Sequence, residues 1–143
     1  MIPMFIKSSQ VLALLFCLTA IPITGFSQAY PSKELLATST TVLNEVIRYP
    51  TTGPAKITAS IITIEPGVET LLHRHPVPMF AYILDGELSV DYGDSGKRIY
   101  KKGEALMESM NTTHRGLNHG TKTVSLLVVY MGADGTNNVE LKK

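Results

Sequence analysis

The feature that most constrains the fold is a series of short β-strand patterns separated by turn sequences. Between residues 39 and 130, runs that are apolar or that alternate between polar and apolar residues are separated by glycine-containing turns. The clearest runs are KITASIITI at 56–64, MFAYIL at 79–84, ELSVDY at 87–92 and TVSLLVVYM at 123–131. Strands of about five to eight residues, with turns about every eight to twelve, are typical of an all-β sandwich or barrel. The sequence therefore predicts an all-β domain.

Two of these runs allow more local predictions. The dipeptide Asp85-Gly86 follows MFAYIL and is the one most typical of a two-residue β-hairpin, so a tight hairpin is expected there. In the next run, Leu88, Val90 and Tyr92 fall on one face of a strand and should point inward.

The first thirty residues differ in character from the rest. A single Lys7 precedes an uncharged apolar run at 11–23, and small residues follow it at Gly25, Ser27 and Ala29. This pattern is typical of a cleaved secretory signal peptide. The alternative is an uncleaved membrane anchor, but the run falls short of the roughly 20 residues that span a bilayer. We therefore expect a periplasmic or secreted protein that has no membrane contact after signal removal.

Four segments follow from this division: a signal peptide at 1–27, an N-terminal arm at 28–54, a barrel at 55–131 and a polar C-terminal tail at 132–143. Within the arm, SKELLATST favours a helix, though weakly, and the tail is expected to be loose. The only cysteine, Cys17, would leave with the signal peptide, so the mature chain could form no disulfide and would depend on its apolar core.

The charge balance excludes one broad class of partner. Lys plus Arg number 13 and Asp plus Glu number 12, so bulk charge attracts the chain neither to nucleic acid nor to an anionic membrane. Partners that are recruited by bulk charge are therefore not expected.

Histidines supply the candidate chemistry. His73 and His75 are two residues apart, so on a strand both imidazoles would lie on the same face. His114, at the start of another predicted strand, is the natural third donor for a metal site that keeps positions open for substrate or water. The alternative is that His73 and His75 are surface residues on a loop stiffened by Pro76 and Pro78.

The spacing around the histidines points to a known family. One series has intervals of five, one, three and six residues between Gly67, His73, His75, Met79 and Gly86. A second has intervals of five, one, two and three residues between Gly103, Ser109, Asn111, His114 and Asn118. Both resemble, without a gap, the two sequence motifs of the cupin family, and the resemblance covers roughly residues 55–131. It implies a jelly-roll barrel, a metal held by the histidines of both motifs, and often a homodimer.

The sequence departs from the family pattern at three positions. Ser109 and Asn111 stand where the family usually has proline and glycine, and both are compatible with a turn. Met79 stands in the place of the glutamate that is usually the fourth ligand. It is either a weak thioether ligand or an apolar residue that fills the space, and both readings stay open.

Without that carboxylate, the site would offer three neutral imidazoles. These suit one divalent transition metal such as Fe, Zn, Ni or Cu better than Mg or Mn.

Tyr82, Glu108 and Asn118 are polar residues on predicted strands that could position a substrate or satisfy a buried backbone group. Arg74 and Arg115 each follow a candidate ligand and should point away from the metal. His119 is expected to be a solvated turn residue.

These observations favour an exported small cupin that binds one divalent metal through His73, His75 and His114. The resemblance implies a metal-dependent enzyme acting on a small organic molecule, with dioxygenase-like chemistry first and isomerase or lyase chemistry behind it. The alternative is a non-catalytic cupin that binds a sugar, an organic acid or a metal. A fold that hosts many functions does not decide between the two.

Overall fold

The computed structural model describes residues 31–142, and within that range the chain is all-β apart from one short 3₁₀ helix. The elements in chain order are β1 (Ala55–Ile64), β2 (His73–Arg74), β3 (Met79–Asp85), β4 (Glu87–Asp91), η1 (Gly93–Ser95), β5 (Lys97–Lys101), β6 (Ala105–Met107), β7 (Arg115–Leu117), β8 (Val124–Ala133) and β9 (Glu140–Leu141). The prediction of an all-β fold is confirmed.

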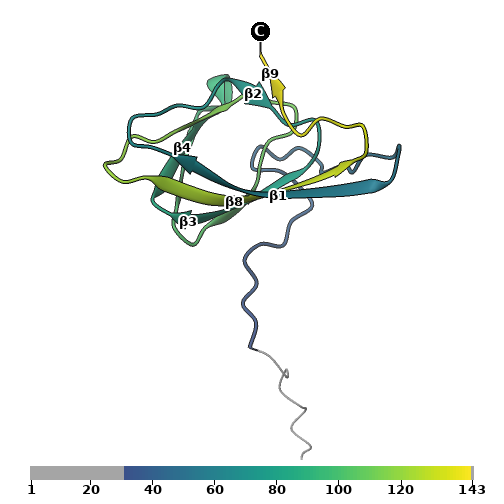
Figure 1. The fold of residues 1–143 in the computed structure, drawn as a ribbon, viewed down its shortest axis with the longest axis horizontal. Coiled ribbons are helices and arrows are strands. Elements are labelled where there is room, and N and C mark those ends of the chain that lie inside the picture. Colours follow the sequence, from purple (N-terminus) through teal and green to yellow (C-terminus); the bar gives the residue numbers. More distant parts are fainter. Residues whose placement is uncertain (1–30, 143) are drawn as a thin grey trace, which may run out of the picture. The chain divides into compact units, whose positions relative to one another are not determined.

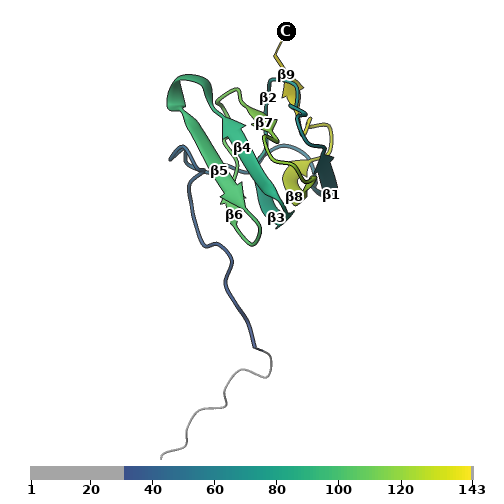
Figure 2. The same ribbon diagram turned by 90° about the vertical axis from the view of Figure 1, so that its left-hand side faces the viewer.

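The strands form three antiparallel sheets. The largest has the order β1-β8-β3-β6, the second has the order β5-β4-β7, and the third consists of β2 and β9. Figure 1 shows the strands curving around one another as a barrel. Figure 2, turned by 90°, shows β4 and β5 on one side of the barrel and β1 and β8 on the other.

The core lies between the two larger sheets because alternate side chains of their strands point inward. Along β8, buried and half-buried residues alternate for most of its length. On the facing sheet, Leu88, Val90 and Tyr92 are all buried, which confirms the inward face predicted for this run. Each fully buried aliphatic side chain contributes roughly 1.5–3 kcal/mol to the stability of the folded chain.

The Asp85-Gly86 dipeptide does not close a hairpin, and that prediction is wrong. β3 pairs with β6 and β8, whereas β4 pairs with β5 and β7, so the dipeptide carries the chain from one sheet to the other. Gly86 has φ 81°, and a Cβ there would lie 3.0 Å from Cα of Val124. Gly86 does form a tight turn, but such a turn can also make a corner between two sheets.

The arm and the tail differ from expectation too. No helix forms over residues 32–40, where Leu35 and Leu36 remain exposed, because a short helix is stable only when an apolar face is packed. The tail is not loose throughout, since Glu140 and Leu141 form β9 and pair with β2.

The signal peptide predicted for residues 1–27 lies outside the described residues. Within residues 31–142, no helix has the length and apolar character needed to cross a bilayer.

Candidate metal centre

The three candidate ligands come from two chain segments that the backbone ties together. His73 begins β2, and His114 directly precedes β7. The N–H of His73 donates to the carbonyl of His114 at 2.9 Å, and the N–H of His114 donates back to the carbonyl of His73 at 2.8 Å. This antiparallel bridge places both side chains on one face, and His75, two residues further along, points to the same face.

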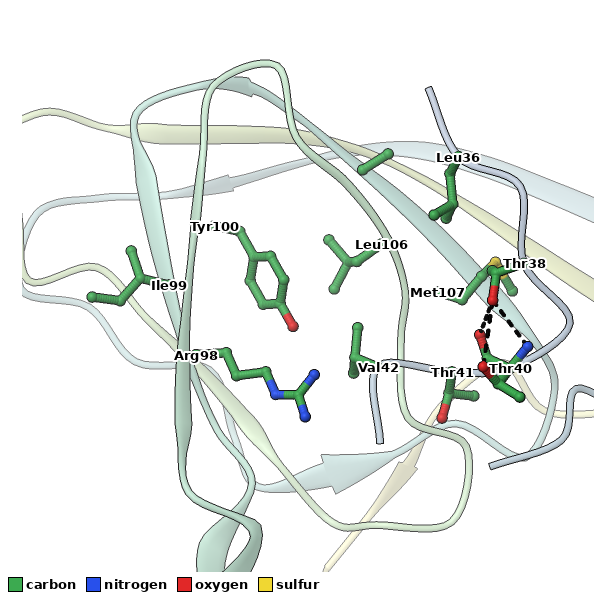
Figure 3. A pocket seen from close by; sticks show the side chains of 11 residues that line it. Leu36, Thr38, Thr40, Thr41, Val42, Arg98, Ile99, Tyr100, Leu106 and Met107 are labelled. Carbon is green, nitrogen blue, oxygen red and sulfur yellow. Dashed lines mark hydrogen bonds between the residues drawn. The ribbon is translucent and has the colours of Figure 1, made fainter. Parts of the chain in front are cut away.

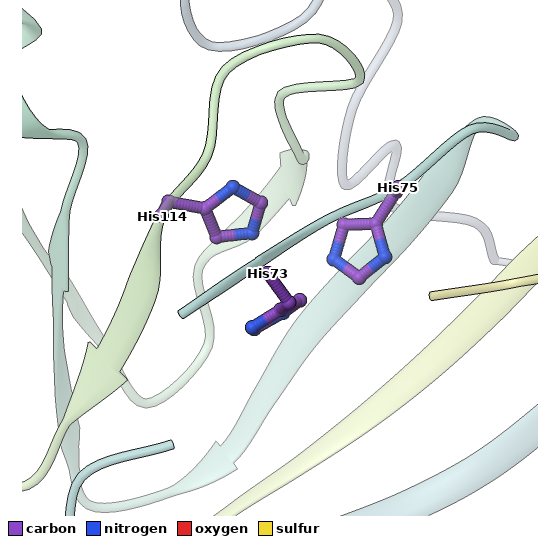
Figure 4. Close-up of side chains that lie close together, drawn as sticks. All are labelled: His73, His75 and His114. Atoms are coloured by element: carbon purple, nitrogen blue, oxygen red, sulfur yellow. The ribbon is translucent and has the colours of Figure 1, made fainter. Parts of the chain in front are cut away.

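The three imidazoles converge as the sequence predicted (Figure 4). Ring centroids lie 4.9 Å apart for His73 and His75, 4.7 Å for His73 and His114, and 5.1 Å for His75 and His114. One ligand atom from each ring lies within 4.8 Å of the others. Because metal–nitrogen bonds are about 2.0–2.1 Å long, modest ring rotations would let one ion contact all three.

In each ring Nδ1 is hydrogen-bonded to a backbone carbonyl, and this bond fixes the tautomer that metal binding requires. Nδ1 of His73 lies 2.6 Å from the carbonyl oxygen of Leu71, and Nδ1 of His75 lies 3.0 Å from that of Asn138. Nδ1 of His114 is held in the same way, 2.9 Å from the carbonyl of Thr112. A carbonyl oxygen only accepts, so each Nδ1 carries the proton, and each Nε2 presents a lone pair. Backbone carbonyls are common partners of metal-binding histidines.

Burial keeps these rings neutral. It lowers the pKa of His75 to about 4, and it also lowers the pKa values of His73 and His114 below the usual value for histidine. Only the neutral imidazole can bind a metal, so the donor set is ready to bind at neutral pH. The residues present therefore fit a divalent transition metal.

The histidines line a small, mostly apolar cavity of about 70 Å³ inside the barrel. Its walls carry aliphatic side chains from β1, β4 and β8, namely Ile62, Ile64, Leu88, Val90, Leu126 and Val128. No Lys or Arg lies among the described residues that line it. A bound water needs roughly 10–15 Å³ of such volume, so the cavity has room for an ion and only a few further atoms.

Glu108 adds a carboxylate to the same cavity. Its side chain is buried, and Oε1 accepts hydrogen bonds from the Tyr92 hydroxyl at 2.8 Å and from the Ser109 N–H at 2.7 Å. Oε2 lies 3.9 Å from Nε2 of His114. Burial raises the pKa of Glu108 to about 7, although both hydrogen bonds oppose that change. The group can therefore hold or release a proton near neutral pH.

The position of Glu108 bears on the missing glutamate of the first motif. Its N–H donates to the carbonyl of Met79 at 2.9 Å, so the two residues are neighbours on adjacent chain segments. Met79 is buried and lines the cavity with the histidines, which is compatible with both readings of its side chain. Glu108 thus supplies a carboxylate to the cavity from the segment that lies beside the one containing Met79.

The two other candidates for substrate positioning lie elsewhere. Tyr82 alternates with the buried Ala81 and Ile83 and does not line the cavity. Asn118 is buried, but its Nδ2 donates to the carbonyls of Ile64 and Lys122, so its side chain holds a turn together. Neither position supports a role in this cavity.

The remaining polar residues of the two motifs lie away from the cavity, as predicted. Arg74 forms a salt bridge with Glu140 at 2.7 Å, and Arg115 forms one with Glu69 at 2.9 Å. His119 is exposed in the turn before β8.

Glu45, in the N-terminal arm, holds the loop that leads to His114, a role that no sequence pattern indicates. Its carboxylate accepts hydrogen bonds from the N–H groups of Met110 and Asn111 at 2.8 and 3.1 Å, and from the Ser109 hydroxyl at 3.1 Å. Although burial would raise the pKa of the Glu45 carboxyl, these hydrogen bonds lower it overall. Ser109, one departure from the family pattern, is therefore accommodated by the hydrogen bond from its hydroxyl to Glu45, whereas Asn111 uses only its backbone N–H, which a glycine would also offer.

Replacing Glu45 by alanine is expected to destabilise the fold by about 1–3 kcal/mol, because several loop donors lose their acceptor. Metal affinity should also fall, since the loop positions His114. Chemical unfolding and metal titration measure the two effects. Glu34→Ala, an exposed residue of the same arm, is the matched control, and equal behaviour of the two variants would contradict the role of Glu45.

A larger hollow of about 500 Å³ lies outside the barrel, between the arm and β5–β6 (Figure 3). It contains no metal-binding cluster of the described residues. Tyr100 lines it, and its hydroxyl lies 3.2 Å from that of Tyr92, which in turn donates to Glu108. The candidate metal site therefore lies in the barrel, and this pair of tyrosines links it to the outer hollow.

Two facing β-sheets that enclose three converging imidazoles define the class: a jelly-roll-like barrel with a site that can hold a metal. The family model of the cupin domain matches residues 60–130, about half of the chain. The chain belongs to the cupin family, which confirms the resemblance seen in the two motifs. No curated protein matches it.

Solved structures of similar fold include enzymes. The DMSP lyase DddQ from Ruegeria pomeroyi DSS-3 aligns with a TM-score of 0.53 and 20% identity over 60% of this chain and 43% of that one. The oxalate decarboxylase of Lactobacillus farciminis aligns with a TM-score of 0.52 and 21% identity over 59% of this chain and 26% of the enzyme. BH2720 from Bacillus halodurans aligns with a TM-score of 0.50 and 19% identity over 57% of this chain and 67% of that one. This chain spans less than half of either enzyme, and identities this low establish the fold alone.

Proposed function

We propose that this chain is an exported cupin that binds one divalent transition metal through His73, His75 and His114 and uses it as an enzyme on a small organic molecule. The observation that carries the proposal is the convergence of three neutral imidazoles within 4.8 Å in a cavity that also contains a buried carboxylate. A purely structural histidine cluster would have no need of three rings held in the same tautomer.

A bound divalent ion would supply a Lewis acid with open coordination positions, or a redox centre if it is iron or copper. The protein's own groups do the remaining work. The aliphatic walls exclude water and fit the apolar part of a small substrate. Glu108 takes up or releases a proton at Oε2, while the Tyr92 hydroxyl holds Oε1 and so fixes the direction of that carboxylate.

Dioxygenase-like chemistry is the expectation from the family resemblance, and isomerase or lyase chemistry follows. A lyase and a decarboxylase among the proteins of similar fold favour bond cleavage on a small molecule. These activities belong to those proteins, and only the barrel is shared.

The test starts from metal content. Purified protein should contain about one equivalent of Fe, Zn, Ni or Cu, and each reconstituted form should be assayed with a panel of small phenols, diketones, thiols and carboxylic acids. Oxygen consumption by the iron form would support a dioxygenase. Turnover without oxygen would support a lyase or an isomerase. Absence of bound metal at purification and after reconstitution would contradict the proposal.

The competing function is a non-catalytic binding module for a small organic acid, a sugar or a metal. It is favoured by Met79, which stands where the family usually supplies a fourth ligand, and by the small volume of the cavity. Stable metal binding with no turnover by any metal form would favour this function.

Restoring the family residue tests the orientation of residue 79. Met79→Glu should tighten Mn²⁺ binding by about tenfold or more, because a carboxylate adds a hard, negatively charged ligand to a site of neutral imidazoles. Met79→Leu is the control, since it keeps the apolar volume and adds no ligand. Calorimetric titration with Mn²⁺ measures the difference, and equal affinities would show that residue 79 does not reach the metal.

A further inference from the structure

The outer hollow has the size and lining of a site for a small molecule. It measures about 500 Å³, whereas the cavity that contains the histidines measures about 70 Å³. Small-molecule pockets typically measure about 300–1,000 Å³ and are mostly apolar, with a few polar groups. Six apolar side chains line the outer hollow: Leu36, Val42, Ile99, Ala105, Leu106 and Met107. It therefore has room for an organic ligand that the barrel cavity could not hold.

Both walls of the outer hollow are held by backbone contacts, so the space is preformed. On the side of the arm, the N–H of Val42 donates to the carbonyl of Met107 at 2.9 Å. On the side of the barrel, β5 pairs with β4 along its whole length. Leu36 and Ile99 nevertheless remain 37% and 57% exposed. Covering apolar surface of this kind is favourable, so the walls favour a ligand with an apolar body.

The charge in the outer hollow comes from Arg98, which is the only charged residue among the described residues that line it. In the described part of the chain no salt bridge involves Arg98, although its two basic neighbours on β5 are both paired. Lys97 lies 3.4 Å from a carboxylate oxygen of Asp91. Lys101 lies 3.6 Å from one of Glu87. The hollow therefore presents a positive charge that no carboxylate of the described residues neutralises.

The pair of tyrosines orients the polar end of the hollow, where Figure 3 shows Arg98 and Tyr100 pointing into the same space. Tyr92 donates its only hydroxyl proton to Glu108, so the hydroxyl of Tyr100, 3.2 Å away, donates to Tyr92. The oxygen of Tyr100 remains an acceptor. Burial raises the pKa of the Tyr100 hydroxyl, and the nearby guanidinium of Arg98 opposes this change. Arg98 has five N–H donors, so contact with Tyr100 leaves donors free for an anion.

We infer that the outer hollow is a second ligand site of this chain and that it binds a small organic monocarboxylate with an apolar body. The carboxylate pairs with Arg98 through two N–H groups, which is the geometry that arginine favours. The apolar body lies against Leu36 and Ile99. A single cation balances one negative charge, so a monocarboxylate fits better than a phosphate dianion. The inference does not depend on metal binding or on catalysis in the barrel.

Calorimetric titration of the full chain with octanoate tests the site. Binding should be saturable and should persist in EDTA, because no metal takes part. Arg98→Gln should weaken binding by about tenfold or more, since a charge-assisted pair is lost. Leu36→Glu should abolish binding, because it places a like charge beside the carboxylate. Lys97→Gln is the matched control: it removes the same charge from β5, but Lys97 is paired with Asp91 and does not line the hollow, so affinity should stay at the wild-type value.

Two further measurements check the ligand class and the location. Octanol lacks the charge and acetate lacks the apolar body, so each should bind about tenfold or more weakly than octanoate. In NMR spectra, octanoate should shift amide signals of residues 36–42 and 98–107. Shifts confined to the surroundings of the three histidines, or equal losses of affinity in Arg98→Gln and Lys97→Gln, would overturn the proposal. Absence of saturable binding, for example because a second copy covers the hollow, would overturn it too.

Discussion

Replacing His75 by alanine is expected to lower the affinity for Zn²⁺ by about a thousandfold. Among the residues that the structure describes, His75 is one of the three histidines whose ligand atoms lie within 4.8 Å of one another. Loss of a residue that merely orients a ligand costs about 10–100-fold in metal affinity, so loss of a ligand itself should cost more. Competition with a chromophoric chelator measures the affinity, and metal analysis of the purified variant gives its occupancy.

The fold should survive this change, because the strands around His75 are held by their own backbone pairing. His75 is 2% exposed, so alanine also leaves a cavity that free imidazole can enter. Added imidazole should therefore restore part of the metal affinity. The matched control is His119→Ala, an exposed histidine that should leave affinity unchanged. Unaltered Zn²⁺ affinity in His75→Ala would contradict the assignment of the site.

Replacing Glu108 by glutamine is expected to remove a penalty that the metal-free protein carries at neutral pH. The pKa of Glu108 in the folded protein is about 7, above the 4.5 of an unperturbed glutamate. This group therefore contributes stability that is fully present below about pH 4.5 and is lost as pH rises through about 7. The difference between the two pKa values corresponds to about 3 kcal/mol.

The measurement compares urea unfolding of wild type and Glu108→Gln at several pH values in the presence of a chelator. Relative to the variant, wild type should lose up to about 3 kcal/mol between pH 4.5 and pH 8. The histidines titrate with the opposite sign because burial lowers their pKa values, but they are present in both proteins and largely cancel. Glu87→Gln, on the exposed end of β4, should show no such trend. Parallel pH profiles for wild type and Glu108→Gln would show that the carboxyl does not experience the buried environment.

The parts of the site that the sequence predicted are those governed by local geometry. Two histidines at positions i and i+2 must share a face on extended backbone, and the second motif supplied His114 through its spacing. The strands were also predictable, because their inward residues alternate as Leu88 and Val90 do. The hairpin prediction failed because Asp85-Gly86 fixes a tight turn without fixing which strands pair on either side.

The supporting contacts could not be predicted because they join residues far apart in the chain. Glu45 reaches the loop at Ser109 across 64 positions, and His75 finds its carbonyl partner 63 positions downstream at Asn138. Glu108 was a candidate among three, and only its burial beside His114 separates it from Tyr82 and Asn118. The sequence around these residues does not indicate which distant segment packs against them.

The contact between His75 and Asn138 has a consequence for the order in which the protein matures. During synthesis, β2 and the first two histidines emerge well before residue 138, so the ring of His75 has no carbonyl to orient it until that later segment has been translated and has packed. A metal arriving early would meet a His75 ring that is not yet held in its binding orientation. Selective loading of the centre is therefore expected only after the strand that contains Glu140 has docked.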